Sequence, residues 1–170
     1  MGLKKFRIIK ATLFLVSLIG FLGQTLVAAP PDGYPFLSLT QAMKKSVAEK
    51  IPMFLYFGRY GCTTCRKMHE EVFIDSGLNK QFSKKFALAY VDTESGNRIR
   101  LSNGERTTEM QFASRSRILG TPTFIYFSAD QKPLFKRAGF QTIEQMTLYN
   151  DYVLEGHYRT AKLKDYMANK

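Results

Sequence analysis

The residues best suited to chemistry in this 170-residue chain are two cysteines, Cys62 and Cys65, which are separated by two residues. A deprotonated thiol is a strong nucleophile, and two thiols at this spacing can form a reversible disulfide. The chain has no other cysteine, so a bridge within it can join only these two. The pair therefore cannot connect distant segments, as the disulfides of small secreted scaffolds do. Its spacing predicts thiol–disulfide exchange.

The cysteines fall where a predicted strand ends and a predicted helix begins. On the first turn of a helix, residues three apart lie on one side, which brings two sulfurs close enough to bond. The unpaired N–H groups and the positive dipole end at that turn favour the thiolate of Cys62. That thiolate would attack a disulfide, and Cys65 would then release the partner from the mixed disulfide. Run in reverse, the same steps oxidise a partner, so the residues leave the direction open.

A metal site is the other use of a cysteine pair. Structural zinc takes four protein ligands, whereas this chain offers one pair and two histidines, His69 and His157. His69 lies four residues after Cys65 and could share its helix face, but a solvent-exposed position is expected for it. Copper(I) needs only two soft ligands, so copper delivery stays open as an alternative. We therefore predict no metal-ligating residues.

A second motif, Gly120-Thr121-Pro122, stands directly before an apolar run at 123–127. A proline cannot donate a hydrogen bond to a sheet, and bonds before proline are the ones that can be cis. The motif therefore predicts a special turn leading into a strand.

The remaining elements alternate between strands and helices. Helix starts are indicated by Ser38 with Gln41, and by Thr142 with Gln145, which are capping-box pairs. On the first helix, Leu39, Met43 and Val47 are expected to form the apolar face. Strands are expected at 53–57, 86–92, 123–127 and 134–138. Helices are expected to begin at 38, 62, 107 or 108, 142 and 160. The helix that begins at 107 or 108 is expected to run through Ile118, and a loop is expected at 93–106. This order predicts an α/β fold, with a central mixed sheet of about four to five strands flanked by helices on both faces.

Residues 1–28 have the layout of a signal peptide. Four basic residues precede an uncharged apolar run at 11–22, and small residues follow at Val27, Ala28 and Ala29. Cleavage is expected after Ala28. The alternative is an uncleaved anchor, because 11–29 carries no charge. Either form leaves the domain outside the cytoplasm, in the periplasm, with 29–37 as a linker and 38–170 as the domain.

The composition, 45% hydrophobic and 23% charged, is that of one globular domain. The formal net charge is +11, and removal of residues 1–28 leaves 21 basic and 14 acidic residues, a charge of +7. No basic run alternates with aromatic residues, so no nucleic-acid partner is expected.

These motifs resemble the thioredoxin superfamily over about residues 36–158. The run 53–57 followed by Gly61-Cys62-Thr63-Thr64-Cys65 resembles its active-site strand and helix, and Gly120-Thr121-Pro122-Thr123 resembles its cis-proline loop. Within the superfamily the chain most resembles the periplasmic thioredoxins of sulfur-oxidation systems, the SoxW-like group. The likeness lies in the residues after the pair, in a long polar insert that contains Asn103-Gly104-Glu105, and in the tail at 152–159. The carboxy-terminal domain of DsbD is next nearest.

The resemblance implies a fold and a set of roles. Cys62 would be the nucleophile and Cys65 the resolving thiol, with no cofactor beyond this pair. The site would be shaped for partners by Gly61, Thr63, Thr64, Thr121 and Pro122. The implied activity is that of a monomeric periplasmic reductase, which receives electrons from a membrane transporter of the DsbD or CcdA type and acts on protein thiols and disulfides. An oxidase or isomerase of the same fold, or a copper(I) chaperone, is the alternative.

Two departures from the family pattern concern proton transfer and direction. The buried aspartate of thioredoxin, six residues before the first cysteine, is replaced by Tyr56, and its tryptophan by Gly61. Proton transfer at Cys65 is therefore expected to use water or another group, such as Glu70. The intervening Thr63-Thr64 includes no histidine to stabilise a thiolate, which argues against a strong oxidase.

Overall fold

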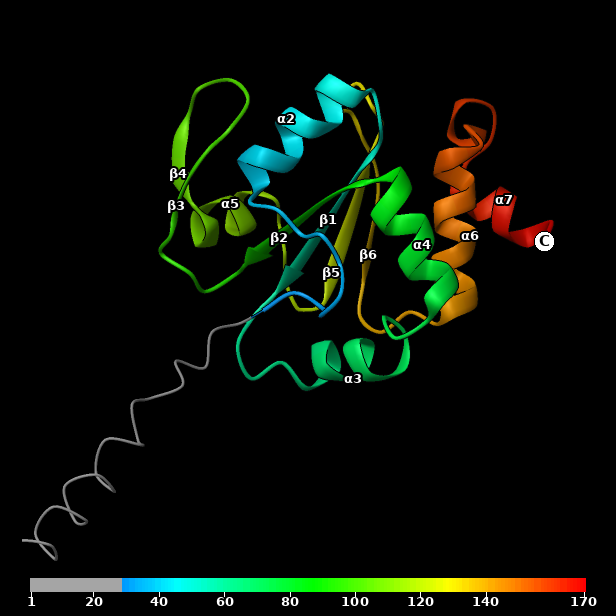
Figure 1. Ribbon diagram of the computed structural model, residues 1–170, viewed down its shortest axis with the longest axis horizontal. Coiled ribbons are helices and arrows are strands. Elements are labelled where there is room, and N and C mark those ends of the chain that lie inside the picture. The colour runs from blue at the N-terminus through cyan, green and yellow to red at the C-terminus, as the bar shows by residue number, and fades with distance from the viewer. Residues whose placement is uncertain (1–28) are drawn as a thin grey trace, which may run out of the picture.

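The computed structural model describes residues 29–170 and is built around one four-stranded sheet (Figure 1). Its strand order is β2-β1-β5-β6, with β1 parallel to β2 and antiparallel to β5, and β5 antiparallel to β6. The strands are β1 (Met53–Gly58), β2 (Ala87–Asp92), β5 (Thr123–Phe127) and β6 (Pro133–Ala138). The expected mixed sheet is confirmed.

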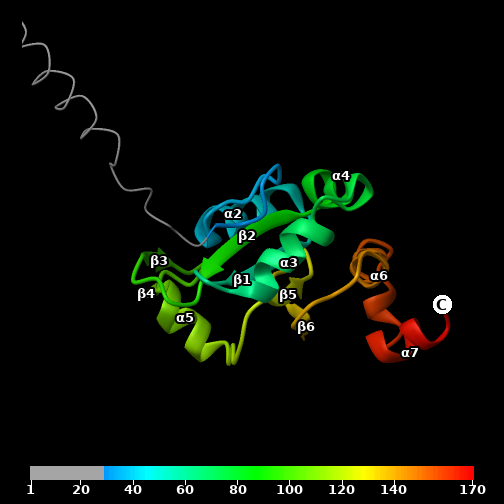
Figure 2. The ribbon, with the colours of Figure 1, turned by 90° about the horizontal axis from the view of Figure 1, so that it is seen from below.

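Helices cover both faces of this sheet. They are α2 (Leu39–Glu49), α3 (Thr63–Glu71), α4 (Ser76–Lys85), α5 (Glu109–Arg115), α6 (Ile143–Leu154) and α7 (Leu163–Ala168), with a 3₁₀ turn, η2 (His157–Arg159), after α6. One core cluster joins one face of the sheet to α2 and α5, and a second joins the other face to α3, α4, α6 and α7. The turned view shows α5 on the opposite side of the sheet from α4 and α6 (Figure 2).

Strand β1 is central to both clusters. All six of its residues are buried, because its side chains alternate between two covered faces. Phe54 and Tyr56 enter the cluster with α3 and α4, and the alternate residues, such as Leu55, enter the cluster with α2. This double coverage explains why the strand reads as a continuous apolar run. Burial on both faces also holds the end of β1 in place, and the segment that carries the two cysteines begins there.

The capping boxes at Ser38 and Thr142 are confirmed, and Thr108 forms a third with Gln111. The expected apolar face of α2 is wrong in part. Leu39 is buried, but Ala42 and Ser46 complete the buried side, and Val47 is 57% exposed. Ser46 tolerates burial because its hydroxyl donates to the Ile51 carbonyl at 2.7 Å.

Four elements differ from the sequence-based expectation. Helix α4 was not expected, because its sequence is mostly polar and buries only Leu78 and Phe82. The expected loop at 93–106 contains β3 (Arg98–Arg100), which pairs with β4 (Arg106–Thr108) in a separate two-stranded sheet. Helix α5 ends at Arg115, so Ile118 lies beyond it.

The segment 29–37, expected as a linker, contacts the domain. Tyr34 lies in the core cluster, and the N–H of Leu37 donates to the Leu88 carbonyl at 2.9 Å. The predicted signal peptide or anchor at 1–28 lies outside the described residues. Within 29–170, no helix is both long and apolar enough to cross a membrane.

Candidate active site

Cys62 and Cys65 lie at the start of α3 and form a disulfide, with their Cα atoms 5.2 Å apart. Cys62 is the N-cap of the helix, and the backbone N–H of Cys65 donates to its sulfur at 3.1 Å. Cys62 is half-buried, whereas Cys65 is only 6% exposed. A partner can therefore reach the sulfur of Cys62 more easily than that of Cys65. The N–H that points at Cys62 and the helix dipole both favour its thiolate once the bond is reduced.

The turn that leads into α3 depends on Gly61. Its φ is +67°, in the left-handed region that favours glycine. No atom lies within 4 Å of the position that a Cβ would occupy there. This conformation lets the chain leave β1 and begin the helix at Cys62. Thr63 is exposed and Thr64 half-buried on the first turn, so Thr63 presents its side chain at the surface beside the disulfide.

The loop before β5 completes the site from a distant part of the chain. The Thr121–Pro122 peptide bond is cis, and the carbonyl oxygen of Thr121 lies 3.4 Å from the sulfur of Cys62. The Pro122 carbonyl accepts from the N–H of Gly139 at 2.8 Å, which ties this loop to the end of β6. The two motifs found in the sequence are thus brought together.

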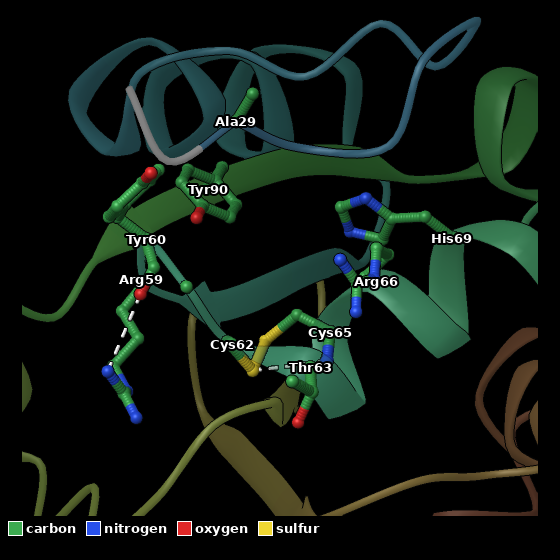
Figure 3. Close-up of a pocket in the computed structure, with 10 residues that line it drawn as sticks. Ala29, Arg59, Tyr60, Cys62, Thr63, Cys65, Arg66, His69 and Tyr90 are labelled. Carbon is green, nitrogen blue, oxygen red and sulfur yellow. Dashed lines mark hydrogen bonds between the residues drawn. A yellow bond between two sulfur atoms is a disulfide. The ribbon is translucent and has the colours of Figure 1, made fainter. Parts of the chain in front are cut away.

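A pocket of about 410 Å³ opens beside the disulfide (Figure 3). Figure 3 shows the two sulfurs on one side of it, and His69 and Tyr90 on the opposite side. Arg59 and Arg66 also line the pocket, and both are exposed. Arg59 forms a long ion pair with Glu94, at 3.4 Å, which offsets its charge only weakly. The two arginines therefore give the rim of the pocket a positive charge.

The pair formed by Tyr56 and His69 was not recognised from the sequence. Tyr56 is fully buried, and its hydroxyl lies 3.0 Å from Nε2 of His69. Burial lowers the pKa of His69 below its ordinary value, against opposing effects of Asp32 and Glu70. Burial also raises the pKa of Tyr56, so its phenol keeps its proton at neutral pH. The only signal available in advance was the four-residue spacing from Cys65 to His69.

The structure corrects two expectations on this helix. His69 was expected in solvent, but it is half-buried because it packs against the rings of Tyr56 and Phe73, at centroid distances of 5.8 and 6.1 Å. Glu70 was suggested for proton transfer, but it is exposed and borders a different hollow, which neither cysteine lines. Among residues 29–170, no group of three metal-ligating side chains is found.

Comparison with known proteins agrees with this geometry. A family model described as "Thioredoxin-like domain" matches residues 39–154. No match was found among curated protein sequences. Among solved structures, a thioredoxin-fold protein from Helicobacter pylori has a TM-score of 0.62 and 19% identity, covering 74% of this chain and 96% of its own.

Two further structures share the fold. A thioredoxin from Thermus thermophilus gives a TM-score of 0.58 and 20% identity, with 71% of this chain and 86% of that chain covered. The reduced DsbD C-terminal domain from Neisseria meningitidis gives 0.53 and 14% identity, with 68% and 93% covered. At these identities the structures show the shared fold alone. The family match, which spans most of the chain and includes the disulfide, shows that this protein belongs to the thioredoxin-like family, as a thiol–disulfide oxidoreductase whose redox-active group is the Cys62–Cys65 pair.

Proposed function

We propose that this oxidoreductase is a periplasmic reductase of protein disulfides, in the SoxW-like group. The observation that carries the proposal is the unequal exposure of its sulfurs: Cys62 is accessible at the N-cap of α3, and Cys65 is buried behind it. Such an arrangement suits attack on a partner by one sulfur and release by the other. The residues between them, Thr63-Thr64, provide no cation to stabilise a thiolate, which supports reduction over strong oxidation.

The reaction starts with both cysteines reduced. The Cys62 thiolate attacks one sulfur of a partner disulfide, and a thiolate of the partner leaves. Cys65 then loses its proton and attacks the Cys62 sulfur of the mixed disulfide. The second partner thiolate leaves and takes up a proton, and the Cys62–Cys65 disulfide is formed. Two electrons have passed to the partner.

The partner segment is proposed to lie against Thr121. Its carbonyl oxygen, 3.4 Å from the Cys62 sulfur, and the adjoining backbone are positioned beside the point of attack. The exposed Arg59 and Arg66 would favour partners with acidic residues near their cysteines. Electrons are proposed to return to the pair from a membrane transporter of the DsbD or CcdA type.

The direction of electron flow is tested by the reduction potential of the pair. The domain is equilibrated against mixtures of reduced and oxidised glutathione, and free thiols are trapped and counted. A value of about −200 mV or lower supports the reductase. A value near about −120 mV contradicts it, because it identifies a disulfide donor whose reduced form is the stabilised one.

Export is tested separately, by mass spectrometry of the full chain expressed in a bacterium with a periplasm. We expect the protein in the periplasmic fraction, with Ala29 as its first residue. A cytoplasmic protein that retains Met1 contradicts the proposed location, and a membrane-bound one that retains 1–28 identifies an anchor.

A further inference from the structure

The exchange reaction needs a proton acceptor that the disulfide itself does not provide. Cys65 is 6% exposed, so its thiol cannot readily lose its proton to bulk solvent before it attacks the mixed disulfide. A group that takes this proton within the pocket would accelerate the second step without altering the first. The titratable side chains that share the pocket with Cys65 are those of Arg59, Tyr60, Arg66, His69 and Tyr90, with Cys62.

His69 is the member of this set that can accept a proton. A guanidinium has donors and no acceptor, and burial raises the pKa of Tyr90, so its phenol stays protonated. Tyr60 is likewise a phenol, and it is half-exposed. His69 follows Cys65 by four residues in α3, which places their Cβ atoms about 6 Å apart on one face of the helix. Water in the pocket that both residues line can connect the thiol to the imidazole ring.

Tyr56 holds the imidazole in place. Its hydroxyl lies 3.0 Å from Nε2, and its ring meets that of His69 edge-on. Tyr56 cannot move aside, because it is fully buried and packs against Phe73 and Phe124 at 5.8 and 5.0 Å. In the neutral imidazole one of the two ring nitrogens carries no proton and can accept one.

We propose that His69, positioned by Tyr56, is the general base that deprotonates Cys65 during release of the partner. This inference rests on the proposed exchange reaction. The proton of the Cys65 thiol passes, through water in the pocket, to the unprotonated ring nitrogen of His69. The Cys65 sulfur bonds to the Cys62 sulfur, and the bond between Cys62 and the partner breaks. The imidazolium returns the proton to the departing partner thiolate, so charge and protons balance.

The surroundings of His69 suit this role. Burial lowers the pKa of the imidazole, which keeps it neutral and able to accept at neutral pH. The carboxylates of Asp32, from the amino-terminal segment, and Glu70, on α3, act in the opposite direction and stabilise the imidazolium that forms. From β1 and β2, the groups facing it are the protonated phenols of Tyr56 and Tyr90, and Arg66 shares the pocket.

The test separates the two steps with oxidised glutathione as the probe. Reduced full-length domain is mixed with it from pH 5.5 to 9, quenched with acid and analysed by mass spectrometry. Loss of the reduced form reports attack by Cys62, and the lifetime of glutathionylated Cys62 reports attack by Cys65. The variants are His69→Gln and Tyr56→Phe. His157→Gln is the matched control, because His157 lies outside the pocket, in η2.

We expect His69→Gln to leave the first step within about twofold and to slow the second about a hundredfold, at the lower end of general-base effects. The second step should then rise with pH as the Cys65 thiolate fraction rises, whereas the wild-type profile levels off at lower pH. Tyr56→Phe should slow the second step by a smaller factor, and His157→Gln should change neither.

The proposal is overturned if glutathionylated His69→Gln resolves at the wild-type rate with the wild-type pH profile. The first step serves as the folding control, since a misfolded variant would lose it too. If the protein is an oxidase and not a reductase, the reduction potential of the pair is oxidising. The rates of the two steps and their dependence on His69 are then unaffected. If no glutathionylated intermediate forms in any variant at any pH, the exchange reaction itself is wrong, and this inference with it.

Discussion

The hydroxyl of Tyr126 donates a hydrogen bond to Oδ1 of Asn150 at 2.9 Å, inside the cluster that joins the sheet to α6. Both residues are fully buried. The amide of Asn150 in turn donates to Gln81 of α4 at 3.0 Å. One buried asparagine therefore connects β5, α6 and α4.

Tyr126→Phe removes the donor and leaves Oδ1 of Asn150 buried without it. We expect the free energy of unfolding to fall by about 1–3 kcal/mol, the cost of an unsatisfied buried polar group. Urea denaturation followed by circular dichroism measures this. Tyr60→Phe is the matched control, since Tyr60 is 51% exposed, and its stability should stay within about 0.5 kcal/mol. An equal effect of both variants would contradict the role of the buried bond.

Serine substitutions distinguish the two sulfurs. Cys65→Ser should accumulate a stable mixed disulfide with a protein substrate, because attack by Cys62 is intact and release is lost. Cys62→Ser should form none and show only background reduction of insulin. Non-reducing gels and mass spectrometry reveal the difference. The reverse pattern would assign the nucleophile to Cys65, despite its burial.

His69 should also make stability depend on pH. Its pKa in the folded state is lowered by burial, so between that value and the unfolded value of about 6.5 the unfolded chain binds more protons. Stability from this group is therefore complete above the unfolded pKa and is lost as pH falls through that window. His69→Gln should lose less stability than the wild type between pH 7.5 and 5, as urea midpoints measure. A parallel fall in the wild type and in His69→Gln would remove His69 as the cause.

Glycine should be needed at position 61 because of its backbone conformation, and not because a side chain would collide with its neighbours. Nothing lies within 4 Å of a Cβ added there, but its φ of +67° is costly for other residues. Gly61→Ala should lower the free energy of unfolding by about 1–2 kcal/mol, and Gly61→Asn by less, because asparagine enters the left-handed region more easily. Gly96→Ala is the control, as Gly96 is equally open without a positive φ. Equal losses in Gly61→Ala and Gly96→Ala would contradict this reading.

The sequence predicted most elements that position the site, because local patterns determine them. The C-x-x-C spacing, the continuous run of β1 and Thr121-Pro122 each identify a part of it, and the structure brings Cys62 and Thr121 within 3.4 Å. Helix α4 was missed because two buried residues, Leu78 and Phe82, are too few to mark an amphipathic period in a polar segment.

The partnership of Tyr56 with His69 could not be predicted in the same way. Tyr56 stands in an apolar run, where the sequence indicates only that it is buried. Its hydroxyl meets His69 because α3 packs across the end of β1, and that contact is tertiary. Likewise, β3 and β4 are three residues each, and their polar composition gives no strand signal without the pairing.

The first described residue, Ala29, lies in the wall of the cysteine pocket (Figure 3). Cleavage after Ala28 would therefore do more than release the domain. It would create an α-ammonium group at Ala29, with an ordinary pKa of about 8, on the side of the pocket opposite the two sulfurs. Export would then also change the charge of the pocket, because the mature amino terminus would add a positive charge that the precursor does not have at this place.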